Sequence, residues 1–170
     1  MLKIEIVEAK ETEKSVLRQL CELYEYDFSE YEGTDVNEHG FYGFKYFDHY
    51  WTEAGRHPFL IKVDGKLAGF VFVSDYRYVE EDPDTRSISE FFVMRKYRRK
   101  GIGKSVAMQV FAKYRGKWEV FQHHGNEPAK LFWEAVISEY TAGNYRKNED
   151  VKMEWGEGQV LSFDNSIEMK

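Results

Sequence analysis

The sequence predicts one mixed α/β domain that spans residues 1–170. Three observations predict this class. Two apolar segments are joined by Asp64-Gly65, a strand-like segment runs through two glycines into a helical pattern between Ile88 and Tyr114, and two strand-like segments follow near the end. No repeat, low-complexity tract or linker divides the chain, and this length is enough to bury one core.

The first third of the chain predicts a strand, a helix and a loop, in that order. Lys3 to Val7 alternates polar and apolar residues, as a half-buried strand does. Glu11 to Phe28 has apolar residues at helical spacing, and Thr12 is a candidate N-cap. Ser29 to Gly40 is acidic and contains two glycines, so we expect a loop. Phe41 to Trp51 is rich in aromatic residues, which favours core packing.

The middle of the chain predicts a hairpin and a third strand. Phe59 to Val63 and Lys66 to Val73 flank Asp64-Gly65. Two residues of this kind between β-rich segments favour a type I′ turn, because both positions need a positive φ. A charged loop follows, and Ile88 to Met94 should be the next strand.

The last third predicts two helices, each followed by strands. Ile102 to Tyr114 has an apolar stripe at helical spacing, and Trp118 to Gln122 has the pattern of a strand. Asn126 is a good N-cap for a helix over Glu127 to Tyr140. We expect this helix to turn three apolar residues inward: Leu131, Phe132 and Ala135. The final strands are Tyr145 to Trp155 and Gln159 to Phe163.

A local inversion of charge marks the strand-to-helix junction. The chain carries net charge −6, yet Phe91 to Trp118 holds nine Lys or Arg and no Asp or Glu, so the remaining residues sum to −15. At a helix start, backbone N–H groups have no partner within the helix, and the dipole adds positive potential. Gly101 and Gly103 would let a ligand approach the backbone closely. A pyrophosphate fits this arrangement, while a solvated cationic face is the plainer alternative.

Other nucleotide-binding motifs do not fit these residues. The third glycine of G-x-G-x-x-G is missing, because position 106 is Val106. The glycine that would open a G-x-x-x-x-G-K-[ST] loop is missing as well. The acidic overall balance also disfavours a dedicated nucleic-acid-binding protein.

Arg98, Gly101 and Gly103 fill the pattern Q/R-x-x-G-x-G/A, which resembles the acetyl-CoA-binding motif of the GCN5-related N-acetyltransferases (GNAT). The order of elements over nearly the whole chain is also similar to that family. The resemblance implies a mixed, mostly antiparallel sheet flanked by helices, with acetyl-CoA as cosubstrate and no metal.

The resemblance also implies a set of cofactor contacts. Backbone groups of Phe92, Val93 and Met94 would meet the pantetheine arm in a gap before the next strand. Asn126 matches a family residue that often contacts the cofactor, and Lys130 would add a phosphate contact. The pyrophosphate would be held by Arg98, Arg99, Lys100, Gly101, Ile102, Gly103, Lys104 and Ser105.

The catalytic groups are less well defined by the motif. In the family a neutral amine attacks the thioester directly, so the enzyme needs a base and a polarised carbonyl. Glu90 is the candidate base, with an exposed strand carboxylate as the plainer alternative, and the Val93 N–H is a candidate donor to the thioester oxygen. Many members have a tyrosine acid seven residues after Asn126; this chain has Trp133, whose indole cannot supply a proton. Tyr140 is a candidate replacement.

Three residues that invite chemistry have simpler interpretations. His123 and His124 are adjacent on a strand or loop and lack Cys or carboxylate partners at ligand spacing, so we expect no metal site. Cys21, the single cysteine, cannot form an intrachain disulfide and fits a buried helical position.

Three functions remain open at this point. The first is an N-acetyltransferase that acts on a primary amine of a small molecule or peptide. The second is a non-catalytic acyl-CoA-binding sensor module, and the third a nucleic-acid-binding domain. With no signal sequence and no apolar run of the ~20 residues that span a bilayer, we expect a cytoplasmic protein without a membrane partner. The acceptor and a homodimeric state stay open.

Overall fold

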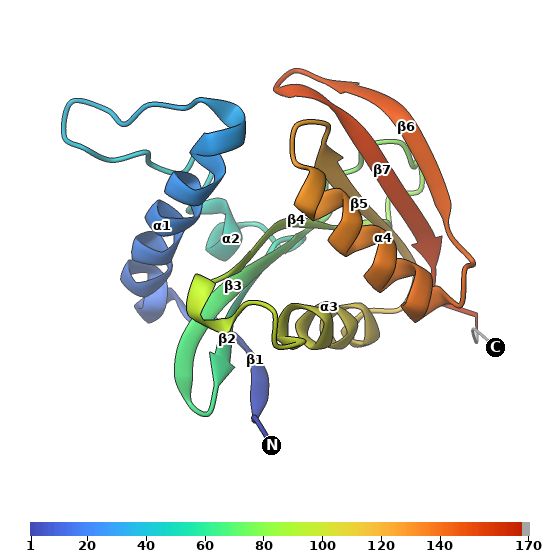
Figure 1. The fold of residues 1–170 in the computed structure, drawn as a ribbon, viewed down its shortest axis with the longest axis horizontal. Coiled ribbons are helices and arrows are strands. Elements are labelled where there is room, and N and C mark those ends of the chain that lie inside the picture. The colour runs from blue at the N-terminus through green and yellow to red at the C-terminus, as the bar shows by residue number, and fades with distance from the viewer. Residues whose placement is uncertain (168–170) are drawn as a thin grey trace.

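The computed structural model describes residues 1–167, in which one sheet of seven strands has the order β1-β2-β3-β4-β5-β7-β6 (Figure 1). Neighbouring strands are antiparallel except β4 and β5, which are parallel. The predicted mixed, mostly antiparallel sheet is therefore confirmed. The strands are β1 (Ile4–Glu8), β2 (His57–Val63), β3 (Lys66–Ser74), β4 (Arg86–Val93), β5 (Lys117–His123), β6 (Arg146–Met153) and β7 (Gly156–Asp164).

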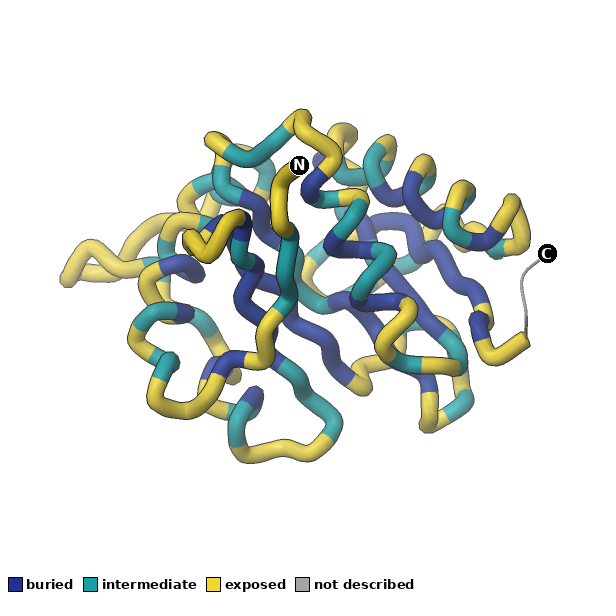
Figure 2. The backbone as a smooth tube through the Cα atoms, turned by 90° about the horizontal axis from the view of Figure 1, so that it is seen from below, coloured by how far each residue is buried: buried dark blue, intermediate teal, exposed yellow. Residues whose placement is uncertain are grey.

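Helices cover both faces of the sheet, and the strands between them are the most buried part of the chain (Figure 2). In residues 1–167, no helix has both the length and the apolar character needed to cross a bilayer. The helices are α1 (Lys14–Glu32), α2 (His49–Thr52), α3 (Ile102–Lys113) and α4 (Glu127–Thr141), with 3₁₀ turns η1 (Glu11–Glu13) and η2 (Arg95–Tyr97).

The alternation of side chains along the strands divides the core in two. On β2 and β3, Ile61 and Val71 pack with α3 and α4, whereas Leu60, Phe70 and Phe72 pack with α1 and the aromatic segment around α2. Runs of consecutive apolar residues in these strands therefore reflect burial on both faces of the sheet.

The β2–β3 hairpin turns as predicted. Asp64 has φ 50° and Gly65 has φ 77°, the two positive values that a type I′ turn requires. The turn sets the pairs Val63–Lys66 and Lys62–Leu67, and a bulge beyond them shifts the register so that Ile61 pairs with Gly69.

The first helix differs from its predicted bounds at both ends. Thr12 is not the N-cap: it lies in η1, and α1 begins after Glu13. The helix also continues past Phe28 to Glu32 and ends at Gly33, which has φ 67° and donates its N–H to the Ser29 carbonyl at 2.8 Å. The acidic residues that suggested a loop from Ser29 onward therefore begin on the exposed last turn of α1.

The predicted inner face of α4 is wrong in part. Trp133, Val136 and Ile137 are buried, whereas two of the residues predicted to face inward do not: Leu131 is 62% exposed, and Ala135 is exposed as well. Apolar residues occupy most of the circumference in this segment, so their spacing alone does not select a face. Phe132 lies between the two faces, partly buried against the core.

The absence of a side chain at Gly69 lets β3 and β4 pair. A Cβ at this position would lie 1.8 Å from the carbonyl oxygen of Phe92, on the strand that carries most of the predicted site. We expect Gly69→Ala to lower the free energy of unfolding by about 3 kcal/mol or more, because the clash is with backbone. Urea unfolding checks this. Gly33→Ala, with nothing within 4 Å of the new Cβ, should cost only ~1–2 kcal/mol from its φ of 67°; equal losses in the two variants would contradict the expectation.

Candidate active site

The sheet opens between β4 and β5. These strands pair only at Arg86–Trp118, Ser87–Glu119 and Ile88–Val120. β4 continues to Val93 and β5 to His123. Over the described residues no further pairing joins them, so an opening lies beyond Ile88 and Val120, where the sequence predicts a gap.

One predicted residue, Val93, turns its backbone into this opening. Met94 donates its N–H to the Ala68 carbonyl at 2.8 Å, and its own carbonyl accepts from Tyr97. Because hydrogen-bonded pairs alternate in an antiparallel ladder, Phe92 also faces β3, whereas Val93 and Phe91 face the opening. The backbone groups of Phe92 and Met94, which were expected to meet the cofactor, instead bond within the protein. Phe91, which the sequence analysis did not name as a cofactor contact, faces the opening.

A bulge in β4 precedes the candidate base. Phe72 pairs with Glu90 but Val73 pairs with Ile88, which leaves Ser89 as the extra residue. The Ser89 hydroxyl lies 3.2 Å from the Phe72 carbonyl and 3.0 Å from the Tyr50 hydroxyl. The bulge increases local twist where the strands separate.

Glu90 is partly buried on the α1 side of the sheet, so the reading as an exposed carboxylate is wrong. The Tyr24 hydroxyl donates to Glu90 Oε2 at 2.5 Å. Burial raises the pKa of Glu90 to about 8; the bond from Tyr24 opposes this rise, and the carboxylates of Glu25 and Glu32 add to it.

Two carboxylates of α1 lie near Glu90. Burial, with Glu32 and Glu22, raises the pKa of Glu25 to about 7, and burial also raises the pKa of Glu32. Glu25 and Glu32 are seven residues apart and therefore share one face of the helix. The sequence analysis missed both residues, although this spacing could have indicated them.

Two further phenols surround the same carboxylate. Tyr50 of α2 and Tyr78 of the β3–β4 loop each have a raised pKa, mainly from burial, and Glu90 contributes to both shifts. The pKa of Tyr50 is about 12. Tyr78 stacks on Phe121 of β5, with ring centroids 5.4 Å apart. No spacing pattern in the sequence indicates these tyrosines, because α1, α2 and the loop meet only in the folded chain.

The glycine turn before α3 exposes backbone donors. Arg99 and Gly101 both adopt left-handed backbone, with φ 60° and 74°. The first helical bond of α3 joins Ser105 N–H to the Gly101 carbonyl at 3.1 Å, so the N–H groups of Ile102, Gly103 and Lys104 precede the helical ladder. This is the anion-binding geometry that the sequence predicts.

The two glycines have different roles in the structure. A Cβ at Gly101 would meet nothing within 4 Å, so this residue serves the turn. A Cβ at Gly103 would lie 3.2 Å from the Phe132 ring and 3.8 Å from Phe91. Gly103 therefore allows α3 to pack closely against α4, which is a different reason for glycine from the ligand approach expected at this position.

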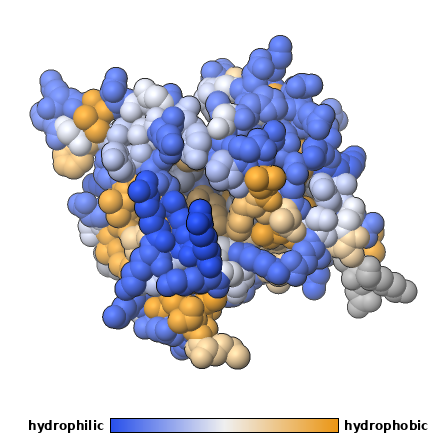
Figure 3. Space-filling model, viewed as in Figure 1, coloured by the Kyte–Doolittle hydropathy of each residue, from blue (hydrophilic) through white to orange (hydrophobic). Residues whose placement is uncertain are grey.

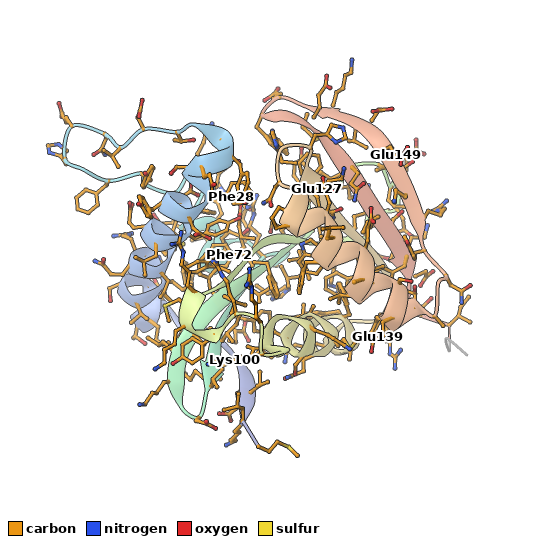
Figure 4. All side chains as sticks on the ribbon, viewed as in Figure 1. Phe28, Phe72, Lys100, Glu127, Glu139 and Glu149 are labelled. Carbon is orange, nitrogen blue, oxygen red and sulfur yellow. The ribbon has the colours of Figure 1, made fainter. Side chains whose placement is uncertain are left out.

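The cationic side chains of the turn fall into two groups. Arg98 Nη2 binds Asp27 of α1 at 2.6 Å, and Arg98 Nε donates to the Val93 carbonyl at 2.7 Å. Lys104 pairs with Glu139 at 2.6 Å. Arg99 and Lys100 are exposed and have no ion-pair partner within residues 1–167. Figure 4 labels Lys100 at the turn before α3, where Figure 3 shows strongly hydrophilic surface.

Asp27, which the sequence analysis missed, connects α1 to this turn. Its carboxylate binds both Arg98 and Arg95, the latter at 2.9 Å. The two guanidinium groups hold the pKa of Asp27 below its ordinary value against an opposing effect of burial. Asp27 and Arg98 are 71 positions apart in the chain, so no local sequence pattern indicates their contact.

Asn126 and Lys130 lie at the start of α4, where β5 ends. The Asn126 side chain accepts the Ala129 N–H at 3.1 Å, which confirms its capping role. Lys130 lies 3.7 Å from Glu127. Both residues are beside the open end of β5, as cofactor contacts would have to be.

Trp133 and Tyr140 pack against the hydrophobic core and make no contact with Glu90. Trp133 is 6% exposed and packs edge-on against Phe91 at 5.0 Å between centroids. Tyr140 packs on Phe111 and accepts from Asn165 at 3.2 Å. It is about 20 Å along α4 from the helix start at Asn126. The structure does not bring Tyr140 to Glu90.

The histidines and the cysteine also take structural places. His123 Nδ1 accepts the Gly125 N–H at 3.0 Å, and His124 lies near Asp150. No group of three metal-ligating side chains occurs in residues 1–167. Cys21 is buried, and burial raises the pKa of its thiol.

The aromatic segment before β2 mainly fills the core. Phe47 and Tyr50 are buried against Phe72. A separate cavity of about 620 Å³ lies between α1 and residues 41–49, next to Arg18. Glu90 and the glycine turn do not line it, so the opening between β4 and β5 is the better candidate for the site.

Comparisons with known proteins agree with this geometry. A model of the acetyltransferase (GNAT) family matches residues 17–136. A comparison with curated protein sequences found no match.

Solved structures share the fold at low identity. An acetyltransferase from Thermus thermophilus has TM-score 0.71 and 11% identity over 95% of this chain and 97% of that one. An aminoglycoside acetyltransferase in complex with coenzyme A has TM-score 0.68 and 12% identity over 95% of each chain. A spermidine N-acetyltransferase from Vibrio cholerae, in complex with CoA and spermine, has TM-score 0.65 and 9% identity over 96% of each chain.

The family match covers more than half of the chain, including β4, the glycine turn and the start of α4. The protein therefore belongs to the acetyltransferase (GNAT) family.

Proposed function

We propose that this protein transfers the acetyl group of acetyl-CoA to a primary amine of a small molecule, by direct attack while both substrates are bound. One observation carries the proposal. The opening between β4 and β5 has the exposed backbone donors of the glycine turn at its outer end and Glu90 near its closed end. A thioester in this opening would point its reacting carbon toward the carboxylate.

The residues present fit acetyl-CoA as cosubstrate. The N–H groups at the start of α3, with Arg99 and Lys100, suit a pyrophosphate. The pantetheine arm would lie along the opening beside Phe91 and Val93, whose backbone groups lack a β-strand partner on that side. Structural neighbours with the same fold were crystallised with coenzyme A, which supports this choice.

Glu90 is suited to accept the proton of the acceptor ammonium. A pKa of about 8 keeps part of the carboxylate ionised near neutral pH, yet makes it a stronger base than an ordinary glutamate. Once Glu90 has taken one proton from the ammonium, the neutral amine nitrogen bonds to the acetyl carbon as the C–S bond breaks. A second proton then passes from the nitrogen to the departing thiolate or to solvent. The Val93 N–H would donate to the thioester oxygen as negative charge develops there.

A dedicated acid is not needed for the leaving group. Trp133 occupies the position of the family's tyrosine acid and is packed in the core. A thiol with a pKa near ~8.5 can leave as the thiolate. We therefore propose that the thiolate departs without help from Tyr140.

A small-molecule acceptor is the choice best supported by the neighbours. Related acetyltransferases were crystallised with kanamycin and with spermine, and both molecules are amines. The carboxylates beside Glu90 suit a cationic acceptor. Isothermal titration with coenzyme A and a thiol-release assay over an amine panel test the proposal; no binding would reject it, and binding without turnover would favour a non-catalytic acyl-CoA-binding protein.

The exposed cations of the turn should contribute to cofactor affinity. We expect the double variant Arg99→Ala/Lys100→Ala to raise the Kd for coenzyme A about 10-fold, or ~1.4 kcal/mol, because two charge contacts to phosphate are lost. Titration calorimetry at low and high salt measures this, with a smaller salt dependence in the variant. Lys66→Ala, at the distant β2–β3 hairpin, is the control, and an unchanged Kd in the double variant would place the phosphates elsewhere.

Glu90→Gln removes the ionisable carboxyl group and keeps the size of the side chain. We expect kcat to fall about 10²-fold or more with the Kd for coenzyme A unchanged. In the wild type, kcat/KM should fall as pH drops through about 8, since the base becomes protonated there; the variant should lose this inflection. Glu8→Gln on the outer strand β1 is the control. A wild-type rate and pH profile in Glu90→Gln would remove Glu90 from the mechanism.

Although Glu90→Gln should lower activity, it should raise the stability of the folded protein at high pH. The pKa of Glu90 is raised from 4.5 to about 8 on folding, so the folded state binds the proton more tightly than the unfolded chain. Wild-type stability should therefore fall as pH rises from about 4.5 to 8. We expect the Tm advantage of Glu90→Gln over the wild type to be larger at pH 9 than at pH 5, measured by thermal denaturation without substrates. A constant difference would argue against the raised pKa.

A further inference from the structure

Three carboxylates around the site lack a cationic partner. Glu25, Glu32 and Glu90 make no ion pair with Lys, Arg or His within the described part of the chain, whereas Asp27 on the same helix binds two arginines. His123, a group near Glu32, accepts the Gly125 N–H at its Nδ1 at 3.0 Å and forms no ion pair with Glu32.

The arrangement is unfavourable in the absence of a ligand. Burial and mutual repulsion raise the pKa of Glu90 to about 8 and that of Glu25 to about 7. Partly buried carboxylates normally acquire a positive partner or a set of hydrogen-bond donors. Here a bound cation would supply what the protein does not.

Tyr78 gives an independent indication of a ligand. Its side chain is partly buried beside Glu90, and its hydroxyl has no hydrogen-bond partner in residues 1–167. The ring is held in place from behind, because the buried carboxylate of Glu119 accepts the N–H groups of Tyr78, Val79 and Glu80 at 3.2, 2.9 and 3.3 Å. Within residues 1–167 only Thr85 Oγ1 is both fully buried and without a partner, so the Tyr78 hydroxyl reaches solvent, where it can donate to or accept from a ligand.

Three phenols approach the same carboxylate. Tyr24, Tyr50 and Tyr78 come to Glu90 from three different elements. Phe72 and the Arg56 guanidinium cover the Tyr50 ring at 4.1 and 5.4 Å, and Tyr78 stacks on Phe121, so a ligand would meet hydroxyl groups and not ring faces. The position at Glu90 therefore combines a carboxylate with phenol oxygens.

The remaining carboxylates extend this position along α1. Glu25 follows Tyr24, the residue that contacts Glu90, and Glu32 is two turns further, or about 10 Å along the helix axis. Glu25 is half-buried and Glu32 is exposed, and Figure 3 shows the surface indented between the C-terminal end of α1 and the β6–β7 hairpin. A compact monoamine at Glu90 would leave Glu25 and Glu32 without a partner.

We propose that the acceptor carries at least two ammonium groups: the reacting amine lies at Glu90 among the three tyrosines, and a second, remote ammonium is bound by Glu25 and Glu32 of α1. This inference rests on the proposed function and specifies its substrate as an extended aliphatic polyamine.

Matched amines of equal length test the proposal. Thiol release from acetyl-CoA is measured with the full-length protein for butylamine against 1,4-diaminobutane, and for octylamine against 1,8-diaminooctane. We expect kcat/KM to be about 10- to 100-fold higher for a diamine than for its monoamine, because charged hydrogen bonds to the second ammonium are made only by the diamine. Equal values within both pairs would overturn the proposal.

A variant separates specific binding from general attraction to an acidic protein. Glu25→Gln/Glu32→Gln should lower kcat/KM about 10-fold more for the preferred diamine than for the monoamines, since the charged hydrogen bonds to the second ammonium are lost only for the diamine. Any change shared by both amines reports the lower pKa of Glu90 in the variant. The variant should fold, because it removes like-charge repulsion. Glu30→Gln removes a charge from the exposed turn beside these residues and is the matched control. Equal losses for monoamines and diamines, or an equal effect of Glu30→Gln, would contradict the assignment.

A binding measurement keeps this test separate from that of the function. The diamine and its monoamine are titrated calorimetrically into the protein saturated with coenzyme A. Tighter binding of the diamine, lost in Glu25→Gln/Glu32→Gln, supports the two-cation site even if no amine is acetylated, in which case only the catalytic proposal fails. Turnover of amines with no preference for a second cation would leave the catalytic proposal in place and reject the two-cation site.

Discussion

The early end of the pairing between β4 and β5 is the constraint on which the site depends. These are the parallel neighbours in an otherwise antiparallel sheet, and their ladder stops at Ile88 and Val120. Both strands continue as extended chain because β3 and β7 pair with their outer edges. The sheet thereby keeps unpaired backbone groups in its middle without losing the strands that carry them, and a ligand can complete the ladder there.

The elements around the opening are held in place from outside it. Asp27 joins α1 to Arg95 and Arg98 of the glycine turn, and Arg98 also binds the Val93 carbonyl. One carboxylate thus connects the helix that carries Tyr24 and Glu25 to the turn that would bind phosphate. The close approach of α3 to α4 at Gly103 sets the other wall. Such contacts reduce the freedom that substrates would otherwise have to remove on binding.

The acidic side of the opening illustrates a conflict between stability and function. Burial raises the pKa of the Glu90 carboxyl, Glu25 and Glu32 raise it further, and the hydrogen bond from Tyr24 lowers it. These effects together place the pKa of the Glu90 carboxyl at about 8, and the ionised carboxylates reduce the stability of the folded state. Perturbed groups of this kind cluster at functional sites because chemistry, not folding, requires them.

The sequence by itself determined the fold class, the β2–β3 hairpin and the glycine turn before α3, because each depends on residues close together in the chain. Asp64-Gly65 requires positive φ values, and Gly101 begins a helix whose first N–H groups are unpaired whatever surrounds them. Only the tertiary structure decided which face of α4 is buried, which backbone groups of β4 remain unpaired, and which side chains surround Glu90. Tyr24, Tyr50 and Tyr78 come from separate elements, and their meeting depends on packing that no local pattern encodes.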